Sequence, residues 1–277
     1  MILRDGQLVE LLNQMEAIGL RALAMRSEGV QKKDKKGYWD IVTKADTMSE
    51  KRVTKLIKRL FPGDGLVGEE GTFIPSRSKR IWYPDPIDGT TNYAAGSDFW
   101  GISLGLVDRG IPVFGMIHYP ALKETLFTDE ASVKFSCSNR PFLKSSLYIG
   151  LPLSAIRLKD ALVVADIHRA RETVGLFDRI RDQTRNCVTF GSFVYETLLL
   201  VTGKVDAVFH TGATPFDIAA AVPIADRAGC TVTGIFDDQE FNFRQPKIPI
   251  VMSRNPELHE ELRLALKNEL SRASRKQ

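Results

Sequence analysis

Cysteine is scarce in this chain of 277 residues, which contains only three. Cys137, Cys187 and Cys230 are odd in number and widely spaced, so they match neither a disulfide framework nor the paired spacing of a zinc site. Long apolar runs are missing as well, because no stretch approaches the roughly twenty apolar residues that a membrane span needs. The first residues also lack the pattern of a signal peptide. We therefore expect a cytoplasmic protein in a reducing compartment, with no membrane partner.

Several well-known catalytic motifs are also absent. The chain has no Walker phosphate loop, no Gly-x-Ser-x-Gly elbow and no His-Glu-x-x-His pair, and its four histidines are too scattered for a zinc cluster. Residues 63–68 match the dinucleotide fingerprint Gly-x-Gly-x-x-Gly, but they follow a predicted helix and precede a predicted strand, which reverses the required order. A covalent serine mechanism and a zinc hydrolase lose their main support. Oxygen-bound metal ions remain as the chemistry that the sequence can supply.

A strong excess of charge of either sign is lacking too. The net charge is +4, and the basic clusters at 32–36 and 272–276 are short. This mild bias favours anionic small molecules and does not imply binding to nucleic acid. With 43% hydrophobic and 26% charged residues, the chain can bury a full core as one large domain or as two halves.

The pattern of apolar residues predicts one catalytic unit of two halves, 1–145 and 146–277. The first half is expected to hold two helices followed by a largely antiparallel sheet. Its predicted elements are a helix at 5–27, a helix from about 46 to 61, strands at 66–67 and 81–83, a hairpin of 99–107 with 111–118, and a strand at 124–128. Thr47 and Glu50 have the spacing of a capping box at the start of the second helix. The charged stretch 32–37 is expected to be a loop.

Strands and helices alternate in the second half, which predicts a layered α/β architecture whose number of layers stays open. The predicted strands are 161–165, 187–190 and 205–209, and the predicted helices are 174–180, 194–201, 216–228 and one that starts at Pro256 after the cap residue Asn255. Pro223 should kink the helix that contains it.

The richest polar segment is Asp85-Pro86-Ile87-Asp88-Gly89-Thr90-Thr91-Asn92, which follows a predicted buried strand. Pro86 holds Asp85 extended, and Gly89 allows a sharp turn after Asp88, so the two carboxylates can converge. Oxygen ligands from these acids, from a carbonyl such as that of Ile87 and from water suit magnesium. The alternative is a polar turn without a ligand.

Three further acids could join this site, and each has a simpler alternative. Glu69, in a pair of glutamates between two glycines, is expected at the end of a short strand, where it could be a ligand or part of a charged surface turn. Asp217 and Asp46 lie at predicted helix starts, where an aspartate is more often a cap than a ligand. The alanines that follow Asp217 would let its helix approach its neighbours closely.

Together these segments resemble the ordered motifs of the inositol monophosphatase family, from about Asp40 to Gly229. The matching segments are Gly68-Glu69-Glu70, the octapeptide from Asp85 to Asn92, Gly191-Ser192 with Gly203 and Asp206-Ala207, and Phe216-Asp217-Ile218-Ala219-Ala220. The resemblance implies a five-layer α-β-α-β-α sandwich, like that of the fructose bisphosphatases. It also implies a magnesium-dependent, lithium-sensitive phosphatase that is commonly a homodimer.

The same resemblance assigns roles to the matched residues. It implies two or three magnesium ions, held by Glu69, Asp85, the carbonyl of Ile87, Asp88 and Asp217. Asp46, Glu69 and Thr90 would be the catalytic group, in which Asp46 and Thr90 orient the attacking water. The implied substrate contacts are Asp88, Gly89, Thr90, Gly191, Ser192, His210 and Asp217. Attack would be in line, without a phosphoenzyme.

The departures from the family pattern concern the substrate more than the chemistry. Phe216 stands where the family usually has tryptophan, and His210 stands where inositol-specific members carry a glutamate. His210 could contact the substrate or simply pack in the core. The stretch from Lys32 to Lys36 could close over the phosphate as a lid or stay a solvated loop.

Two classes of function fit these observations. The first is a magnesium-dependent phosphomonoesterase for a small metabolite such as inositol 1-phosphate, with histidinol phosphate, a sugar phosphate or a nucleotide 3′-phosphate as alternatives. The second is a non-catalytic regulatory or nucleic-acid-binding protein with the same fold. A protein that only binds has no need of four converging carboxylates, which favours the enzyme.

Overall fold

The structure of the chain is a computed structural model that describes residues 2–37, 40–137, 156–167, 173–236 and 241–275. The chain divides into two compact units. The first consists of Met1–Lys144 with two short segments of the second half, Gly191–Tyr195 and Phe216–Ile224. The second consists of Ser145–Phe190, Glu196–Pro215 and Ala225–Gln277. Helices α5 (Phe193–Val201) and α6 (Pro215–Arg227) therefore each contain residues of both units.

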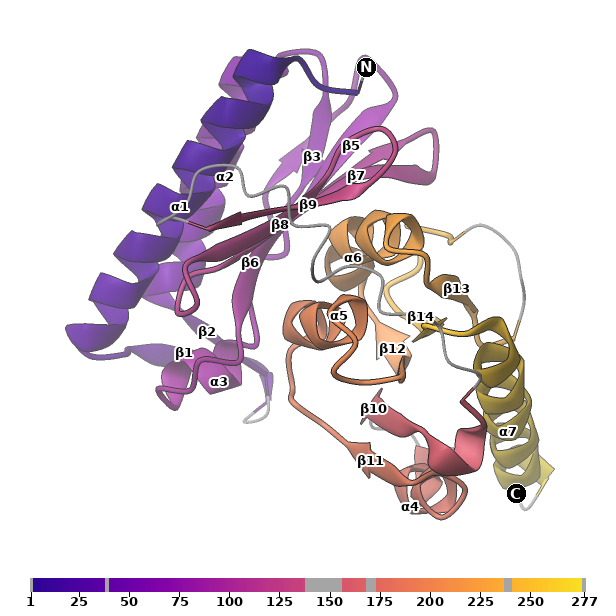
Figure 1. The fold of residues 1–277 in the computed structure, drawn as a ribbon. Coiled ribbons are helices and arrows are strands. Elements are labelled where there is room, and N and C mark those ends of the chain that lie inside the picture. The colour runs from indigo at the N-terminus through magenta and orange to yellow at the C-terminus, as the bar shows by residue number, and fades with distance from the viewer. Residues whose placement is uncertain (1, 38–39, 138–155, 168–172, 237–240, 276–277) are drawn as a thin grey trace. The chain divides into compact units, whose positions relative to one another are not determined.

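The first unit has a seven-stranded sheet covered by two long helices, α1 (Asp5–Ser27) and α2 (Lys44–Leu60), which lie side by side (Figure 1). Its strand order is β4-β3-β5-β6-β7-β8-β9, and only the β3–β5 pair is parallel. The strands are β3 (Gly65–Val67), β4 (Phe73–Ile74), β5 (Arg80–Asp88), β6 (Gly101–Asp108), β7 (Ile111–Tyr119), β8 (Glu124–Thr128) and β9 (Val133–Cys137). The predicted hairpin, β6 with β7, is confirmed.

Buried apolar side chains from both helices and the sheet form the core of this unit. Met15 of α1 and Val53 of α2 are completely buried, as are Trp82 of β5 and Leu104 of β6. The buried apolar residues recur at helical spacing along one side of each helix, which is the pattern of a helix packed on a sheet. The core therefore fixes α2, which carries Asp46, and β5, which carries Asp85, Ile87 and Asp88.

Three local expectations for the first unit are wrong. Helix α2 begins at Lys44, and its capping box joins Thr43 to Asp46 rather than Thr47 to Glu50. The lysine-rich stretch 32–37 is strand β1 (Lys32–Gly37), because it pairs with β2 (Asp40–Thr43) in a two-stranded antiparallel sheet. The predicted strand 81–83 is too short, since β5 continues through both aspartates to Asp88 with an irregularity in its pairing between them, whereas the sharp turn expected after Asp88 is present at Gly89.

Two glycines let the start of α6 (Pro215–Arg227) pack directly on the sheet. A Cβ atom at Gly105 of β6 would lie 2.3 Å from the backbone of Ala219, and one at Gly115 of β7 would lie 2.1 Å from the carbonyl oxygen of Ala220. Contacts this short leave no room for a side chain. The close approach expected from the alanines is present, and it holds the first turn of α6, with Asp217, against the strands.

The second unit contains a five-stranded mixed sheet of order β11-β10-β12-β14-β13. Its strands are β10 (Leu162–Asp166), β11 (Asn186–Val188), β12 (Ala207–Ala213), β13 (Thr231–Gly234) and β14 (Ile248–Ser253). The helices are η1 (Leu158–Asp160), α4 (Leu176–Arg181), α5 (Phe193–Val201) and α7 (Pro256–Arg275), besides α6. The predicted cap of α7 is confirmed, since the backbone N–H of Leu258 donates to Asn255 Oδ1 at 2.9 Å. Pro223 lies inside α6, as expected, and the kink at this position stays a prediction.

The small helix α3 (Thr90–Ala94) completes the first unit directly after the aspartate-containing strand. Gly89 precedes it with φ of +86°, a left-handed conformation that suits glycine. A Cβ atom there would also lie 2.9 Å from the carbonyl oxygen of Phe99.

Among the described residues, no helix is both long and apolar enough to span a membrane.

Candidate metal centre

Three of the predicted ligands converge in the first unit. Asp85 and Asp88 come from the end of β5, and Asp217 comes from the first turn of α6. One carboxylate oxygen from each lies within 4.8 Å of the others. Asp85 is 3% exposed and Asp88 is 9% exposed, so the cluster is largely shielded from water. Buried oxygen donors at this spacing form the kind of set that hard divalent cations bind.

The electrostatics of Asp85 show that this cluster favours positive charge. Burial raises the pKa of Asp85 well above its ordinary value, and the negative charges of Glu69, Asp88 and Asp217 raise it further. A divalent cation would offset both effects because it stabilises the ionised carboxylates. The residues present therefore fit a magnesium site in the chemistry of their donors and in their charge.

Asp88 is held in place by the segment around Gly191. Its Oδ2 atom accepts a hydrogen bond from the Ser192 hydroxyl at 2.7 Å and another from the backbone N–H of Val194 at 2.7 Å. Hydrogen bonds to a carboxylate are stronger than those between neutral groups, so they fix the orientation of the aspartate. Gly191 and Ser192 thus lie next to the acid cluster, and their contact with a substrate stays a prediction.

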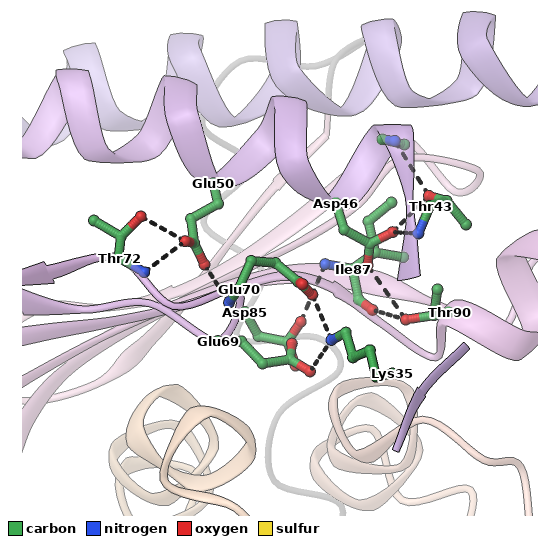
Figure 2. Close-up of polar contacts among 11 residues, drawn as sticks. Lys35, Thr43, Asp46, Glu50, Glu69, Glu70, Thr72, Asp85, Ile87 and Thr90 are labelled. Carbon is green, nitrogen blue, oxygen red and sulfur yellow. Dashed lines mark hydrogen bonds and ion pairs between the residues drawn. The ribbon is translucent and has the colours of Figure 1, made fainter. Parts of the chain in front are cut away.

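Asp46 and Thr90, the predicted water-orienting pair, lie together. The Thr90 hydroxyl is 3.3 Å from Asp46 Oδ1 and 3.0 Å from the carbonyl oxygen of Ile87, and it can donate to either (Figure 2). The other carboxylate oxygen of Asp46 accepts from the backbone N–H of Thr43 at 2.8 Å and from its hydroxyl at 2.5 Å. Burial raises the pKa of Asp46, while the bonds from Thr43 lower it. Asp46 is therefore both a helix cap and a candidate site residue.

Glu69 lies in the turn after β3, next to a lysine that the sequence analysis placed in a loop. Lys35 Nζ lies 3.2 Å from Glu69 Oε1 and 2.5 Å from Glu70 Oε1 (Figure 2). Burial raises the pKa of Glu70 to about 7, although the bond and the charge of Lys35 lower it. Burial alone would lower the pKa of Lys35, but the two glutamates raise it above its ordinary value.

Glu50, which is not part of the capping box that its spacing to Thr47 predicts, is a second charged residue near the site. It is 3% exposed on the inner face of α2, and its carboxylate contacts the turn that contains Glu69. A signal was present in the sequence, because Glu50 has helical spacing to the apolar residues Val53 and Ile57. An acid on the apolar face of a helix is rarely buried without partners.

His210 belongs to the second unit, where it is paired with a buried acid. Its Nε2 atom is 2.6 Å from Glu196 Oε2, and its Nδ1 atom is 3.9 Å from Asp166 Oδ2. Glu196 is completely buried and also accepts from the backbone N–H of Phe190 at 3.2 Å. His210 itself is 5% exposed. The first unit thus gathers the three aspartates and the Asp46–Thr90 pair, and in the second unit the imidazole of His210 is paired with the carboxylate of Glu196.

Comparison with known proteins identifies one family. The model of the inositol monophosphatase family matches residues 7–271. A fructose-1,6-bisphosphatase/inositol-1-monophosphatase of Thermotoga maritima is 31% identical over 217 residues, which cover 78% of this chain and 79% of that protein. The match to the family model includes nearly all of the chain and every segment that carries a predicted site residue.

Solved structures show the same fold. An IMPase of Thermotoga maritima has a TM-score of 0.79 and 25% identity, and the match covers 97% of this chain and 99% of that one. An IMPase/NADP phosphatase complexed with Mg²⁺ and phosphate has a TM-score of 0.77 at 19% identity, with 94% of both chains covered. The expected mixed α/β fold class is thereby confirmed.

Proposed function

This chain belongs to the inositol monophosphatase family and is a metal-dependent phosphatase, and we propose that it is a magnesium-dependent phosphomonoesterase for a small phosphorylated metabolite. The observation that carries this proposal is the convergence of Asp85, Asp88 and Asp217 within 4.8 Å. The structural neighbour that was complexed with Mg²⁺ and phosphate supports the choice of metal. We propose Glu69 and the carbonyl of Ile87 as further ligands of two or three ions.

Bound magnesium ions would supply Lewis-acid stabilisation of the phosphoryl oxygens and would lower the pKa of a bound water. Of the chain's own residues, Thr90 is suited to orient a water molecule, because its oxygen can accept a hydrogen bond from water while its hydroxyl group donates to Asp46 or to the carbonyl oxygen of Ile87. Asp46 is held rigidly by Thr43, so the acceptor for that hydroxyl group is fixed in space. This arrangement supports general-base assistance without a covalent intermediate.

The remaining substrate contacts are proposals drawn from the matched motifs. Gly89 and Thr90 would donate backbone N–H hydrogen bonds to the phosphate, and Asp88, Gly191, Ser192 and Asp217 would border it. Inositol 1-phosphate is the first substrate to test because the family and the Thermotoga relative are named for it. The double name of that relative also shows that one protein of this family acts on more than one phosphate ester.

A phosphate-release assay tests the function. Purified protein would be incubated with inositol 1-phosphate, histidinol phosphate, fructose 1,6-bisphosphate and adenosine 3′-phosphate, each with Mg²⁺ and with a chelator. We expect magnesium-dependent release from at least one substrate and none with the chelator. If the folded protein releases phosphate from none of them, the proposal fails and the non-catalytic alternative gains support. Homodimer formation, lithium sensitivity and cytoplasmic location stay predictions.

A further inference from the structure

One buried side chain of α2, Glu50, forms hydrogen bonds with the turn between β3 and β4. Its Oε2 atom accepts from the backbone N–H of Glu70 at 2.7 Å. Its Oε1 atom accepts from the backbone N–H of Thr72 at 3.1 Å and from the Thr72 hydroxyl at 2.6 Å (Figure 2). A single carboxylate thus binds three donors of a five-residue turn, which includes Glu69.

The packing around this carboxylate is equally specific. Gly68 opens the turn, and a Cβ atom there would lie 2.5 Å from the Glu50 carboxylate carbon and from Oε2. The turn also closes on itself, since the backbone N–H of Gly68 donates to the carbonyl oxygen of Thr72 at 2.7 Å. Glu50 is 3% exposed, and a buried carboxylate is tolerated only when donors satisfy it. The absence of a side chain at Gly68 leaves room for the Glu50 carboxylate, and the residues of the turn supply its hydrogen-bond donors.

We propose that Glu50 is a positioning residue that sets the place of Glu69 in the metal centre. The inference rests on the proposed function, in which Glu69 is a metal ligand. Glu50 does not touch the cluster itself, because its contacts go to the residues on either side, Gly68, Glu70 and Thr72. Its carboxylate holds the backbone of the turn, and the backbone directs the Glu69 side chain. Groups that orient metal ligands in this way typically contribute about 10- to 100-fold to metal affinity.

Glu50→Gln is the informative variant because it keeps the size of the side chain but replaces one acceptor oxygen with an NH₂ group. That group would face a backbone or hydroxyl donor of the turn, so at least one of the three hydrogen bonds is lost. Thr72→Val removes one donor and should have a smaller effect of the same kind. Glu50→Asp keeps both acceptors on a shorter stem and should restore part of the loss.

Val53→Ala is the matched control, since Val53 is completely buried on the same helix and is not part of the turn. It should lower the melting temperature through a cavity and leave the turn in place. For each variant, calorimetric titration with Mg²⁺ alone gives the metal dissociation constant, and activity gives the Mg²⁺ concentration at half-maximal rate and kcat at saturating Mg²⁺. We expect Glu50→Gln to raise the first two about 10- to 100-fold, with a much smaller change in kcat.

Hydrogen exchange separates failure of this inference from failure of the proposed function, because it needs neither metal nor substrate. In Glu50→Gln, the amides of Glu70 and Thr72 should lose protection, and in Val53→Ala they should keep it. The inference is overturned if Glu50→Gln leaves both amides protected, or if it changes metal affinity no more than Val53→Ala at equal loss of melting temperature. A wild-type protein that binds no Mg²⁺ would contradict the proposed function while the exchange result still decides whether Glu50 holds the turn.

Discussion

The acid cluster of the first unit and the buried Glu196 of the second unit are stabilised in opposite ways. In the first unit, Asp85, Asp88 and Asp217 lie within 4.8 Å of one another, and burial together with mutual repulsion raises the pKa of Asp85. In the second unit, Glu196 is buried just as deeply but lies 2.6 Å from the imidazole of His210. A buried acid with its own partner is satisfied by the protein, whereas a cluster of like charges is stable only with a bound cation or with added protons. The difference distinguishes a candidate metal site from a buried acid that a neighbouring side chain satisfies.

The largest expected effect comes from the acid cluster itself. Asp88→Asn removes one negative charge but retains a carbonyl oxygen that can accept from Ser192 and Val194. We expect turnover to fall by at least about 10² at saturating Mg²⁺, because electrostatic stabilisation by the metal site contributes most of the barrier reduction. The melting temperature should change little. Phosphate release and thermal unfolding measure the two effects, and turnover above a few per cent of wild type would remove Asp88 from the metal site.

The positions of these acids were only partly predictable from the sequence. The strand-to-turn context and the density of oxygen ligands indicated Asp85 and Asp88 directly, while Asp46 and Asp217 looked like ordinary helix caps. Asp46 is indeed a capping residue, and it also lies beside Thr90. The contact with Thr90 joins two residues that are 44 positions apart in the sequence, so no local sequence pattern can predict it.

The capping error shows the same limit within a single helix. The spacing of a threonine followed three residues later by an acid occurs twice, as Thr43 with Asp46 and as Thr47 with Glu50. Spacing alone cannot choose between them. Strand β2 ends at Thr43, which caps the helix that starts at Lys44, and Glu50 falls on the inner face one turn after Asp46. Likewise, the lysine-rich β1 is a strand because of its partner, since its own residues have low strand preference.

A second prediction concerns the contact that holds Asp217 in the first unit. In Gly115→Ala, the new methyl group would lie 2.1 Å from the carbonyl oxygen of Ala220, so the start of α6 must shift. Overpacking of this kind costs about 1 to 3 kcal/mol, and more where the obstacle is backbone. Urea unfolding measures the loss of stability, and titration with Mg²⁺ should show weaker binding because Asp217 moves with the helix.

Gly63→Ala is the control for this substitution. No atom lies within 4 Å of a Cβ atom at Gly63, and its φ is not positive, so the stability should change by less than about 0.5 kcal/mol. If Gly115→Ala is as stable as this control and binds Mg²⁺ normally, the close approach of α6 to β7 does not position Asp217.

A third pair of variants tests the comparison between the units by the sign of the effect. In metal-free protein at neutral pH, Asp85→Asn should increase the free energy of unfolding by about 1 kcal/mol, because it removes a carboxylate whose ionisation is unfavourable in the fold. Glu196→Gln should decrease it by about 1 to 3 kcal/mol, because the imidazole of His210 loses its carboxylate partner. Thermal unfolding in a chelator measures both.

The pH dependence of the Asp85 effect follows from the direction of its pKa shift. A carboxyl group whose pKa is raised by folding destabilises the fold above its ordinary pKa of 3.8, so the gain from Asp85→Asn should disappear as the pH falls toward that value. Mg²⁺ should reverse the order of stability, because only the wild-type cluster binds it tightly. Variants that shift stability in the same direction in the chelator would show that the two acids are equivalent.

An effect that depends on pH is expected at the first unit's own buried histidine. His118 is 2% exposed, its Nδ1 atom lies 2.9 Å from the hydroxyl of Thr125, and burial lowers its pKa from 6.5 to about 4. In the unfolded chain, His118 binds a proton below about pH 6.5, whereas in the folded protein it binds one only below about pH 4. Stability from this group is therefore complete above pH 6.5 and is lost as the pH falls through that window.

His118→Gln should flatten the pH dependence of unfolding between pH 6.5 and 4, by up to about 1.4 kcal/mol per pH unit, at some cost in stability at neutral pH. His210→Gln serves as the comparison, because His210 faces the carboxylates of Glu196 and Asp166, which favour its charged form. It should therefore leave most of this acid sensitivity in place. The measurement is urea unfolding across this pH range. Equal flattening by both variants would show that a hydroxyl partner and a carboxylate partner have the same effect on the protonation of a buried imidazole.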